Sequence, residues 1–212
     1  MLEKIVYYFQ NRSGEFWRYA GQHIGVSLLA LMIALIITVP LGILLYRYRI
    51  GRTIGERLFG FLRIVPSLAV LAFLIPLMGS GIRPALVALV ILAMPPILIN
   101  TIQAFLNLPA DLTEGARGMG MSDAQIFFRV KLPLAFPQMF AGIRTAAVEI
   151  VASATIASYI GAGGLGVIIF SGLNLLRYDL LIIGGGAVAI LSLATGFVLD
   201  QLLKYMTRYR RA

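Results

Sequence analysis

Residues 24–46 read IGVSLLALMIALIITVPLGILLY and contain no charged side chain. An α-helix rises about 1.5 Å per residue, so about 20 apolar residues are needed to cross the hydrocarbon core of a bilayer. Inside lipid the backbone must satisfy its own hydrogen bonds, which a helix does within one segment. This stretch therefore predicts a membrane-spanning helix, and it decides the fold class of the chain.

Four further stretches are long and apolar enough to span a bilayer: 58–78, 84–106, 138–160 and 180–203. We therefore expect an all-α membrane protein with about five transmembrane helices in a single domain, residues 1–212. Prolines inside membrane helices are tolerated where neighbouring groups satisfy the freed backbone, and they bend the helix. We expect such bends at five positions: Pro40, Pro66, Pro76, Pro95 and Pro96.

The composition agrees with a membrane protein and excludes several other classes. The chain is 59% hydrophobic and 13% charged, whereas soluble domains are about 45–50% apolar and about 25% charged. It has no cysteine and one histidine, which excludes disulfides, thiolate metal sites and multi-histidine metal sites. It has no phosphate-binding loop of the form G-x-x-x-x-G-K-[ST], and it offers no nucleophile–base–acid set. We therefore expect neither catalysis nor a resident cofactor in this chain.

The distribution of basic residues predicts the orientation in the membrane. Five spans place the two termini on opposite sides, and the side that carries more Lys and Arg faces the cytoplasm. The side of the membrane that holds the C-terminus carries eleven basic residues, and the side that holds the N-terminus carries five. We therefore expect the N-terminus outside and the C-terminus in the cytoplasm. This excess of basic residues on the cytoplasmic side explains the net charge of +9, so the charge does not indicate a nucleic-acid-binding protein, and we expect no binding of nucleic acid. The eleven are Arg47, Arg49, Arg52, Arg57, Arg117, Arg129, Lys131, Lys204, Arg208, Arg210 and Arg211, and the five are Lys4, Arg12, Arg18, Arg83 and Arg177.

Two segments outside the spans have a predicted form. Residues 1–22 are expected to form an interfacial helix on the outer leaflet. The longest cytoplasmic segment, 107–137, is expected to contain two short helices. The first begins near Pro109 and ends near Met119, and the second opens with a capping box at Ser122 and Gln125 and ends before Pro133. Such a helix–turn–helix is either a passive connector or a docking platform for a soluble partner.

The 107–137 segment resembles the EAA loop of ABC importer permeases. The resemblance rests on the run Glu114-Gly115-Ala116-Arg117-Gly118-Met119-Gly120-Met121, followed by Ile126 and Leu132-Pro133. In that family the loop docks in a groove of a separate ATPase subunit, which binds ATP and Mg²⁺. The sequence departs from the family pattern at Gly115, where alanine is usual. The resemblance implies that ATPase coupling is carried by Glu114, Gly115, Ala116, Gly118, Met119, Gly120 and Met121.

The resemblance covers nearly the whole chain and narrows to the osmoprotectant subfamily. It rests on Pro66-Ser67-Leu68-Ala69, on residues 141–146, and on residues 154–166, which end in a glycine-rich stretch. It implies a MetI-like type I importer permease fold in a bacterial inner membrane and a substrate such as glycine betaine, carnitine or choline. It also implies three partners: ATPase subunits, a second permease copy or sister permease, and a substrate-binding protein. Methionine and phosphonate permeases share the glycine-rich stretch, so another small, amino-acid-like solute remains an alternative.

Two charged residues depart from the subfamily pattern, Arg63 and Glu149. Glu149 lies near the middle of its expected span, where an isolated carboxylate is costly and needs a partner or water. It either attracts a cationic substrate in the pathway or forms a structural ion pair with Arg63 or Arg144. The small polar residues Ser67, Thr155 and Ser158 are either pathway-lining or helix-packing residues.

The glycine-rich stretch Gly161–Gly166 also spells G-x-G-x-x-G, but a dinucleotide site needs a preceding strand and a βαβ unit. We expect instead a flexible external connection. The apolar segment 167–176 that follows is too short to span, and it forms either a re-entrant helix or a surface loop. His23 is expected at a membrane interface.

Two other functions are compatible with several spans and a cytoplasmic loop. A carrier that works without ATP would usually show an inverted internal repeat with broken helices at matching positions, and the sequence shows no convincing repeat. A membrane assembly factor would use the loop only to bind a partner and would have no substrate-dependent activity.

Overall fold

A computed structural model describes residues 1–207 of the chain, and this part is all-helical. Three of the basic residues assigned above to the cytoplasmic side, Arg208, Arg210 and Arg211, lie outside the described residues. The elements are α1 (Leu2–Arg47), α2 (Arg49–Leu62), α3 (Ser67–Met78), α4 (Ile82–Leu106), α5 (Ala110–Gly118), α6 (Asp123–Gln125), a π-helical segment (Ile126–Lys131), α7 (Leu132–Ala157), a 3₁₀ turn (Ser158–Ile160), α8 (Gly166–Asn174) and α9 (Tyr178–Met206).

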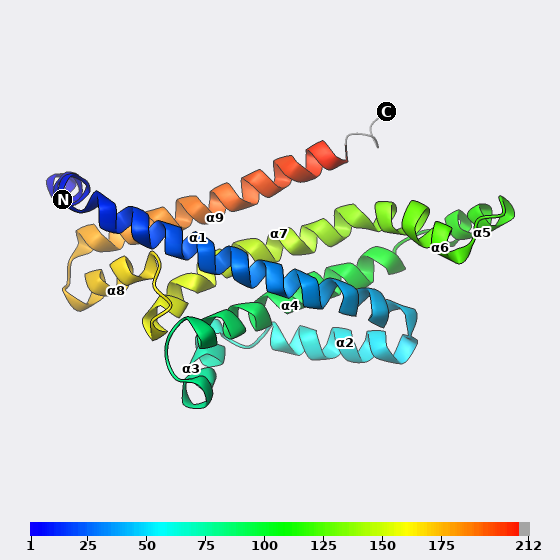
Figure 1. Cartoon of the computed structure of the whole chain (residues 1–212), viewed down its shortest axis with the longest axis horizontal. Helices are drawn as coiled ribbons and strands as arrows, with labels where there is room; N and C mark the ends of the chain where they lie inside the picture. The colour runs from blue at the N-terminus through cyan, green and yellow to red at the C-terminus, as the bar shows by residue number, and fades with distance from the viewer. Residues whose placement is uncertain (208–212) are drawn as a thin grey trace.

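The long helices α1, α4, α7 and α9 run along the long axis of the molecule (Figure 1). The N-terminus lies at one end of this axis, and α5 and α6 lie at the other. Four helical stretches of the described chain are long and apolar enough to cross a membrane, and the bent pair α2 and α3 adds a fifth. The expected all-α fold with about five spans is therefore confirmed.

Helix α4 is the centre of the packing, because it contacts both α1 and α7 along its length. Small residues make this close approach possible: Ala30 and Ala34 of α1 and Ala88 and Ala93 of α4 are fully buried. Gly142 of α7 meets α4 so closely that an added Cβ would lie 2.6 Å from the Pro96 carbonyl oxygen. Small interface residues are the usual means of packing helices in membranes, where lipid provides little hydrophobic drive between them.

The predicted continuous second span, 58–78, is wrong. Helices α2 and α3 meet at an angle of 92°, and the break lies between Arg63 and Pro66. Pro66 has no N–H to donate, its ring restricts the preceding residue, and its own backbone is extended, with φ −60° and ψ 137°. The expected bend at Pro66 is thus confirmed as a break, whereas the helices continue through Pro40, Pro76 and the Pro95–Pro96 pair.

The predicted end of a short helix before Pro133 is also wrong. The helical stretch runs from Asp123 to Ile160 without interruption, through the π-helical segment and into α7. A proline inside an α-helix loses one hydrogen bond and clashes with the carbonyl four residues earlier. The wider π turn just before Pro133 changes the hydrogen-bond register there, and the helix passes the proline.

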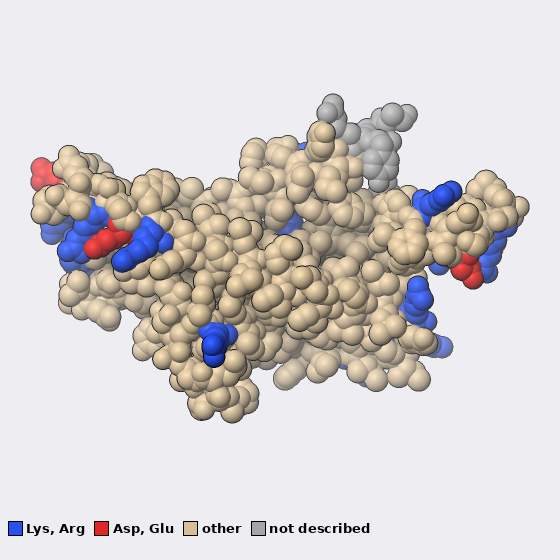
Figure 2. Space-filling model, viewed as in Figure 1, with Lys and Arg blue, Asp and Glu red and all other residues tan. Residues whose placement is uncertain are grey.

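Charged side chains gather at the two ends of the molecule, and the middle of the visible face is almost entirely uncharged (Figure 2). Large apolar side chains are exposed over this middle part, among them Met32, Ile36, Ile190 and Leu193. An exposed apolar belt between two charged ends is the surface expected of a protein surrounded by lipid.

Candidate functional site

The turn after α5 has the geometry of a Schellman motif. The N–H of Met121 donates to the carbonyl of Ala116 at 3.2 Å, and the N–H of Gly120 donates to the carbonyl of Arg117 at 2.9 Å. Gly120 has a φ of 79°, a left-handed conformation that glycine adopts without the steric cost of a Cβ. The sequence Gly118-Met119-Gly120-Met121 therefore stops α5 and reverses the chain into α6.

The start of α6 is fixed by the capping box that the sequence predicts. The Gln125 backbone N–H donates to the Ser122 hydroxyl at 3.4 Å, and the Ser122 backbone N–H donates to Gln125 Oε1 at 2.8 Å. Arg117 and Asp123 join the two helices across the turn, with Nη2 and Oδ1 3.0 Å apart. Ala116 and Ile126 are each 2% exposed, and α5 packs on the π-helical segment. The 107–137 loop is thus a defined helical unit.

One face of α5 is left open. A Cβ added to Gly115 or Gly118 would meet nothing within 4 Å, and Met119 beside them is 77% exposed. Glycine in a helix interior costs about 0.5–1 kcal/mol relative to alanine, so nothing within the described chain favours glycine at Gly115, which lies inside α5. A face of this kind suits the close approach of another molecule. Glu114, Gly115, Gly118, Met119 and Gly120 are all exposed, whereas Ala116 is buried and Met121 half-buried.

Three stacked aromatic rings connect this loop to the long helices. Tyr46 of α1 stacks on Phe105 of α4 with ring centroids 4.6 Å apart, and Phe105 stacks on Phe127 of the π-helical segment at 5.7 Å. The guanidinium of Arg47 lies over Phe127 at 5.6 Å from the ring centroid. Asn107 donates to the Gln138 side chain at 3.2 Å. The loop is therefore attached to α1, α4 and α7, and sequence reasoning did not identify this attachment.

Two ion pairs connect α7 to other parts of the chain. Arg63, in the break between α2 and α3, faces Glu149 of α7 with Nη2 and Oε1 3.9 Å apart. Arg144 of α7 pairs with Asp200 of α9 at 2.6 Å. The expected partner of Glu149 is thus Arg63 and not Arg144. Ser67 is the first residue of α3 and is half-buried, close in sequence to the break.

The other two polar candidates lie under the glycine-rich stretch. The Ser158 hydroxyl donates to the carbonyls of Ala154 at 3.2 Å and Gly163 at 2.5 Å. The Thr155 hydroxyl is buried and has no hydrogen-bond partner among the described residues. Ser158 is therefore committed to tying the loop to α7, which agrees with a packing role.

The glycine-rich stretch is hydrogen-bonded to neighbouring segments, and the flexibility expected from sequence stays a prediction. The Gly164 N–H donates to Gln22 Oε1 at 3.1 Å, and the Gly81 N–H donates to the Ile160 carbonyl at 2.6 Å. Gly163 and Gly164 have positive φ, and a Cβ on either would meet the side chain of Gln22 or His23. The segment that follows is helical and packs against α9 as α8.

His23 is buried against α7, and its expected position at a membrane interface stays a prediction. The side chain is 1% exposed, and its Nε2 lies 2.9 Å from the Val151 carbonyl oxygen. His23 belongs to a stripe of small and polar residues along α1 that faces α4 and α7, which a helical periodicity of small residues could have revealed. The other buried members of this stripe include Ala20, Ser27, Ala30, Ala34, Thr38 and Gly42.

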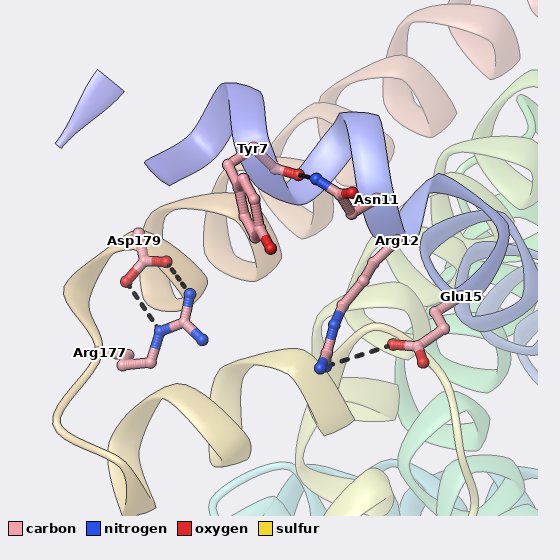
Figure 3. A network of polar contacts seen from close by, with 6 residues as sticks. All are labelled: Tyr7, Asn11, Arg12, Glu15, Arg177 and Asp179. Atoms are coloured by element: carbon pink, nitrogen blue, oxygen red, sulfur yellow. Dashed lines mark hydrogen bonds and ion pairs between the residues drawn. The ribbon is translucent and has the colours of Figure 1, made fainter. Parts of the chain in front are cut away.

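A second polar cluster lies at the end opposite α5 and α6 (Figure 3). Arg177 and Asp179 face one another through two hydrogen bonds of 2.5 and 3.3 Å, and Asp179 is 3% exposed. The hydrogen bond to Asp179 raises the pKa of Arg177 above its ordinary value. Asn11 donates to the Tyr7 carbonyl at 2.8 Å, one residue before the kink at Arg12. The helix expected over residues 1–22 is therefore not separate but continuous with α1, which has a kink at Arg12.

Comparison with known proteins gives relatives over nearly the full chain. Residues 38–211 match the family described as binding-protein-dependent transport system inner membrane component. The chain is 43% identical to the carnitine transport permease protein OpuCB of Listeria monocytogenes, over 95% of this chain and 92% of that protein. It is 40% identical to the glycine betaine/carnitine/choline transport system permease protein OpuCB of Bacillus subtilis, over 93% and 91%.

The fold also resembles a solved structure. The chain superposes on the MetNI methionine ABC transporter in an inward-facing conformation with a TM-score of 0.76, over 91% of this chain and 96% of that one, at 24% identity. A likeness at this identity concerns the fold, and it agrees with the MetI-like fold expected from sequence.

Proposed function

The chain belongs to the family of binding-protein-dependent transport system inner membrane components, and from this premise we propose that it is the permease of an ATP-driven importer for quaternary ammonium osmoprotectants. Glycine betaine, carnitine and choline are the substrates named for its relatives. Membership in the family makes it a multi-pass inner-membrane protein that forms part of a transport system. The exposed glycine face of α5 is the observation in this chain that best supports docking of an ATPase.

In this proposal the 107–137 loop faces the cytoplasm, and α5 lies in a groove of a separate ATPase subunit that binds ATP and Mg²⁺. Gly115 and Gly118 let the partner approach the backbone of α5, Met119 provides an exposed apolar contact, and the Schellman turn fixes the angle to α6. Glu114 and Arg117 lie at the exposed rim, where charges guide orientation more than affinity.

The pathway forms between this chain and a second permease, either another copy or a sister chain. Ion-paired residues such as Arg63 and Glu149 are half-exposed in the isolated chain, with side-chain exposures of 55% and 41%. Ionisable groups in membrane helices face protein or water and not lipid, so this face either contacts the second permease or lines the pathway between the two. A binding protein outside the membrane delivers the substrate, and ATP-driven closure of the two ATPases moves the two loops.

Gly118→Trp tests the docking role directly. The indole would occupy the open face of α5, where the chain itself has room for it. We expect the variant to fold and insert, to lose the co-purifying ATPase subunit in mild detergent, and to lose ATP-dependent uptake. Thr113→Ala is the matched control, because Thr113 lies on the side of α5 opposite Gly115 and Gly118 at 3.6 residues per turn. Normal uptake by Gly118→Trp would refute docking at this face.

A further inference from the structure

The two ion pairs that α7 makes differ in strength. Arg144 and Asp200 are 2.6 Å apart, and Arg144 Nε also donates to the Gly196 carbonyl at 3.4 Å, so this pair is a tight link between α7 and α9. The nearest atoms of Arg63 and Glu149 are 3.9 Å apart, which is beyond hydrogen-bond distance. Glu149 therefore keeps free acceptor capacity on its carboxylate.

Glu149 also opens onto a cavity. The cavity has a volume of about 350 Å³, lies between α7 and α9, and is lined by Arg144, Thr145, Val148, Glu149, Ser192, Leu193 and Gly196. The charge of Arg144 is balanced by its ion pair with Asp200, whereas Glu149 has no hydrogen-bonded cation among residues 1–207. This volume is at the lower end of the range found for small-molecule sites. Glu149 lies eight residues before the end of α7, which places it about 12 Å from that end. A small solute in the cavity would thus meet a carboxylate deep in the spans.

The chemistry of a quaternary ammonium group suits this environment. The group carries a permanent positive charge but has no N–H, so it is bound by electrostatic attraction and apolar contact and not by hydrogen bonds. A carboxylate beside Val148 and Leu193 provides both. A tightly paired carboxylate such as Asp200 could not accept the cation without first breaking its 2.6 Å ion pair with Arg144.

Arg63, the ion-pair partner of Glu149, lies where it can move away from the carboxylate. Arg63 lies in the break between α2 and α3, where no helix constrains its backbone on the C-terminal side. A carboxylate inside a membrane needs a partner or water, and Arg63 is the partner nearest to Glu149 when the pathway is empty. A movement at the break would replace Arg63 by the cationic group of the substrate beside Glu149, with little change in the net charge there.

We propose that Glu149 binds the cationic group of the substrate during passage, and that Arg63 occupies this carboxylate when the pathway is empty. This inference rests on the proposed function and assigns the residue that selects for positive charge. Glu149 is then a specificity residue, and Arg63 is the internal cation that the substrate replaces.

The test compares the two partners of the pair in the assembled transporter, reconstituted in liposomes with its ATPase, binding protein and radiolabelled choline. We expect Glu149→Gln to lower the maximal uptake rate at least tenfold, with KM unchanged because the binding protein sets it. Arg63→Gln removes only the competing cation, and we expect a loss of less than threefold. The charge exchange Arg63→Glu with Glu149→Arg should not restore uptake.

A purely structural pair predicts the opposite pattern. It predicts equal losses for Glu149→Gln and Arg63→Gln, and recovery in the charge exchange, and this result would overturn the inference. The Arg144→Asp with Asp200→Arg exchange is the internal control, because a structural pair should regain assembly there. If Glu149→Gln does not assemble, the uptake rate of Arg63→Gln decides alone. A loss of less than threefold then supports the inference, and a tenfold loss overturns it.

Failure of the inference is distinguishable from failure of the proposed function. Wild-type uptake of choline with no effect of Glu149→Gln overturns only the role of Glu149. A wild-type transporter that hydrolyses ATP and imports solutes regardless of their charge overturns both the role of Glu149 and the substrate class.

Discussion

Gly120→Ala tests whether the turn between α5 and α6 sets the geometry of the 107–137 loop. Gly120 has a φ of 79°, and an L-residue in the left-handed region costs about 1–2 kcal/mol. Two backbone hydrogen bonds close the turn, and each contributes about 0.5–1.5 kcal/mol net, or about 1–3 kcal/mol together. The strain and the closing energy are thus of the same size, so alanine should leave the turn near balance between closed and open forms.

The assay is amide hydrogen exchange of the purified chain in lipid nanodiscs. A loss of about 1–2 kcal/mol corresponds to a fall of about 5–30-fold in the protection of the amides at positions 120 and 121. In the reconstituted transporter, we expect the uptake per ATP hydrolysed to fall as well, because α5 no longer holds one angle to α6.

Gly118→Ala is the matched control for the turn. Gly118 is the last residue of α5, is not left-handed, and has open space around it, so alanine should stabilise the helix by about 0.5–1 kcal/mol. Protection at 120 and 121 should then be equal to or above that of the wild type. Wild-type protection in Gly120→Ala, or an equal loss in both variants, would refute the role given to the left-handed residue.

Two further predictions concern the end of the molecule opposite α5. Gly166→Ala should lower stability in detergent by about 1–3 kcal/mol, because its Cβ would collide with the Thr155 carbonyl and the Ser158 hydroxyl; Gly186→Ala, with nothing within 4 Å, should not. Equal melting temperatures for these two variants would count against close packing of the glycine-rich stretch. Arg177→Gln should cost about 1–3 kcal/mol by leaving the buried Asp179 carboxylate without its partner, whereas Arg12→Gln at the exposed pair with Glu15 should cost about 0–1 kcal/mol. Thermal unfolding in detergent measures both, and a larger loss in Arg12→Gln would contradict the burial argument.

The features of the chain that depend on local chemistry were predictable from the sequence. The expected helix from Pro109 to Met119 is observed as Ala110–Gly118, and the capping box at Ser122 and Gln125 is present with both bonds. Capping and turn residues act within a few positions along the chain, so their effect can be read from sequence without knowledge of the packing.

The features that depend on packing were not predictable in the same way. Hydropathy measures the length and apolarity of 58–78 but does not register that Pro66 divides it into two helices at 92°. The buried position of His23 depends on which side of α1 meets α7, and the order of the glycine-rich stretch depends on Gln22, about 140 residues earlier in the chain. A partner at such a distance in sequence leaves no local signal.

The continuous helix from Asp123 to Ile160 gives these separate features a common mechanical basis. Its 38 residues span about 57 Å at 1.5 Å per residue. One end carries the capping box beside α5, the middle carries Arg144 and Glu149, and the other end carries the 3₁₀ turn that leads into the glycine-rich stretch. A helix that ended before Pro133, as the sequence suggested, would leave a hinge between the docking loop and the pathway. Because the π-helical segment carries the chain past Pro133 without a break, we expect a displacement of the loop to reach Glu149 through the same continuous helix. Under the function proposed above, we expect loading of Glu149 and the position of the 107–137 loop to be coupled through α7, with the break at Arg63–Pro66 beside Glu149.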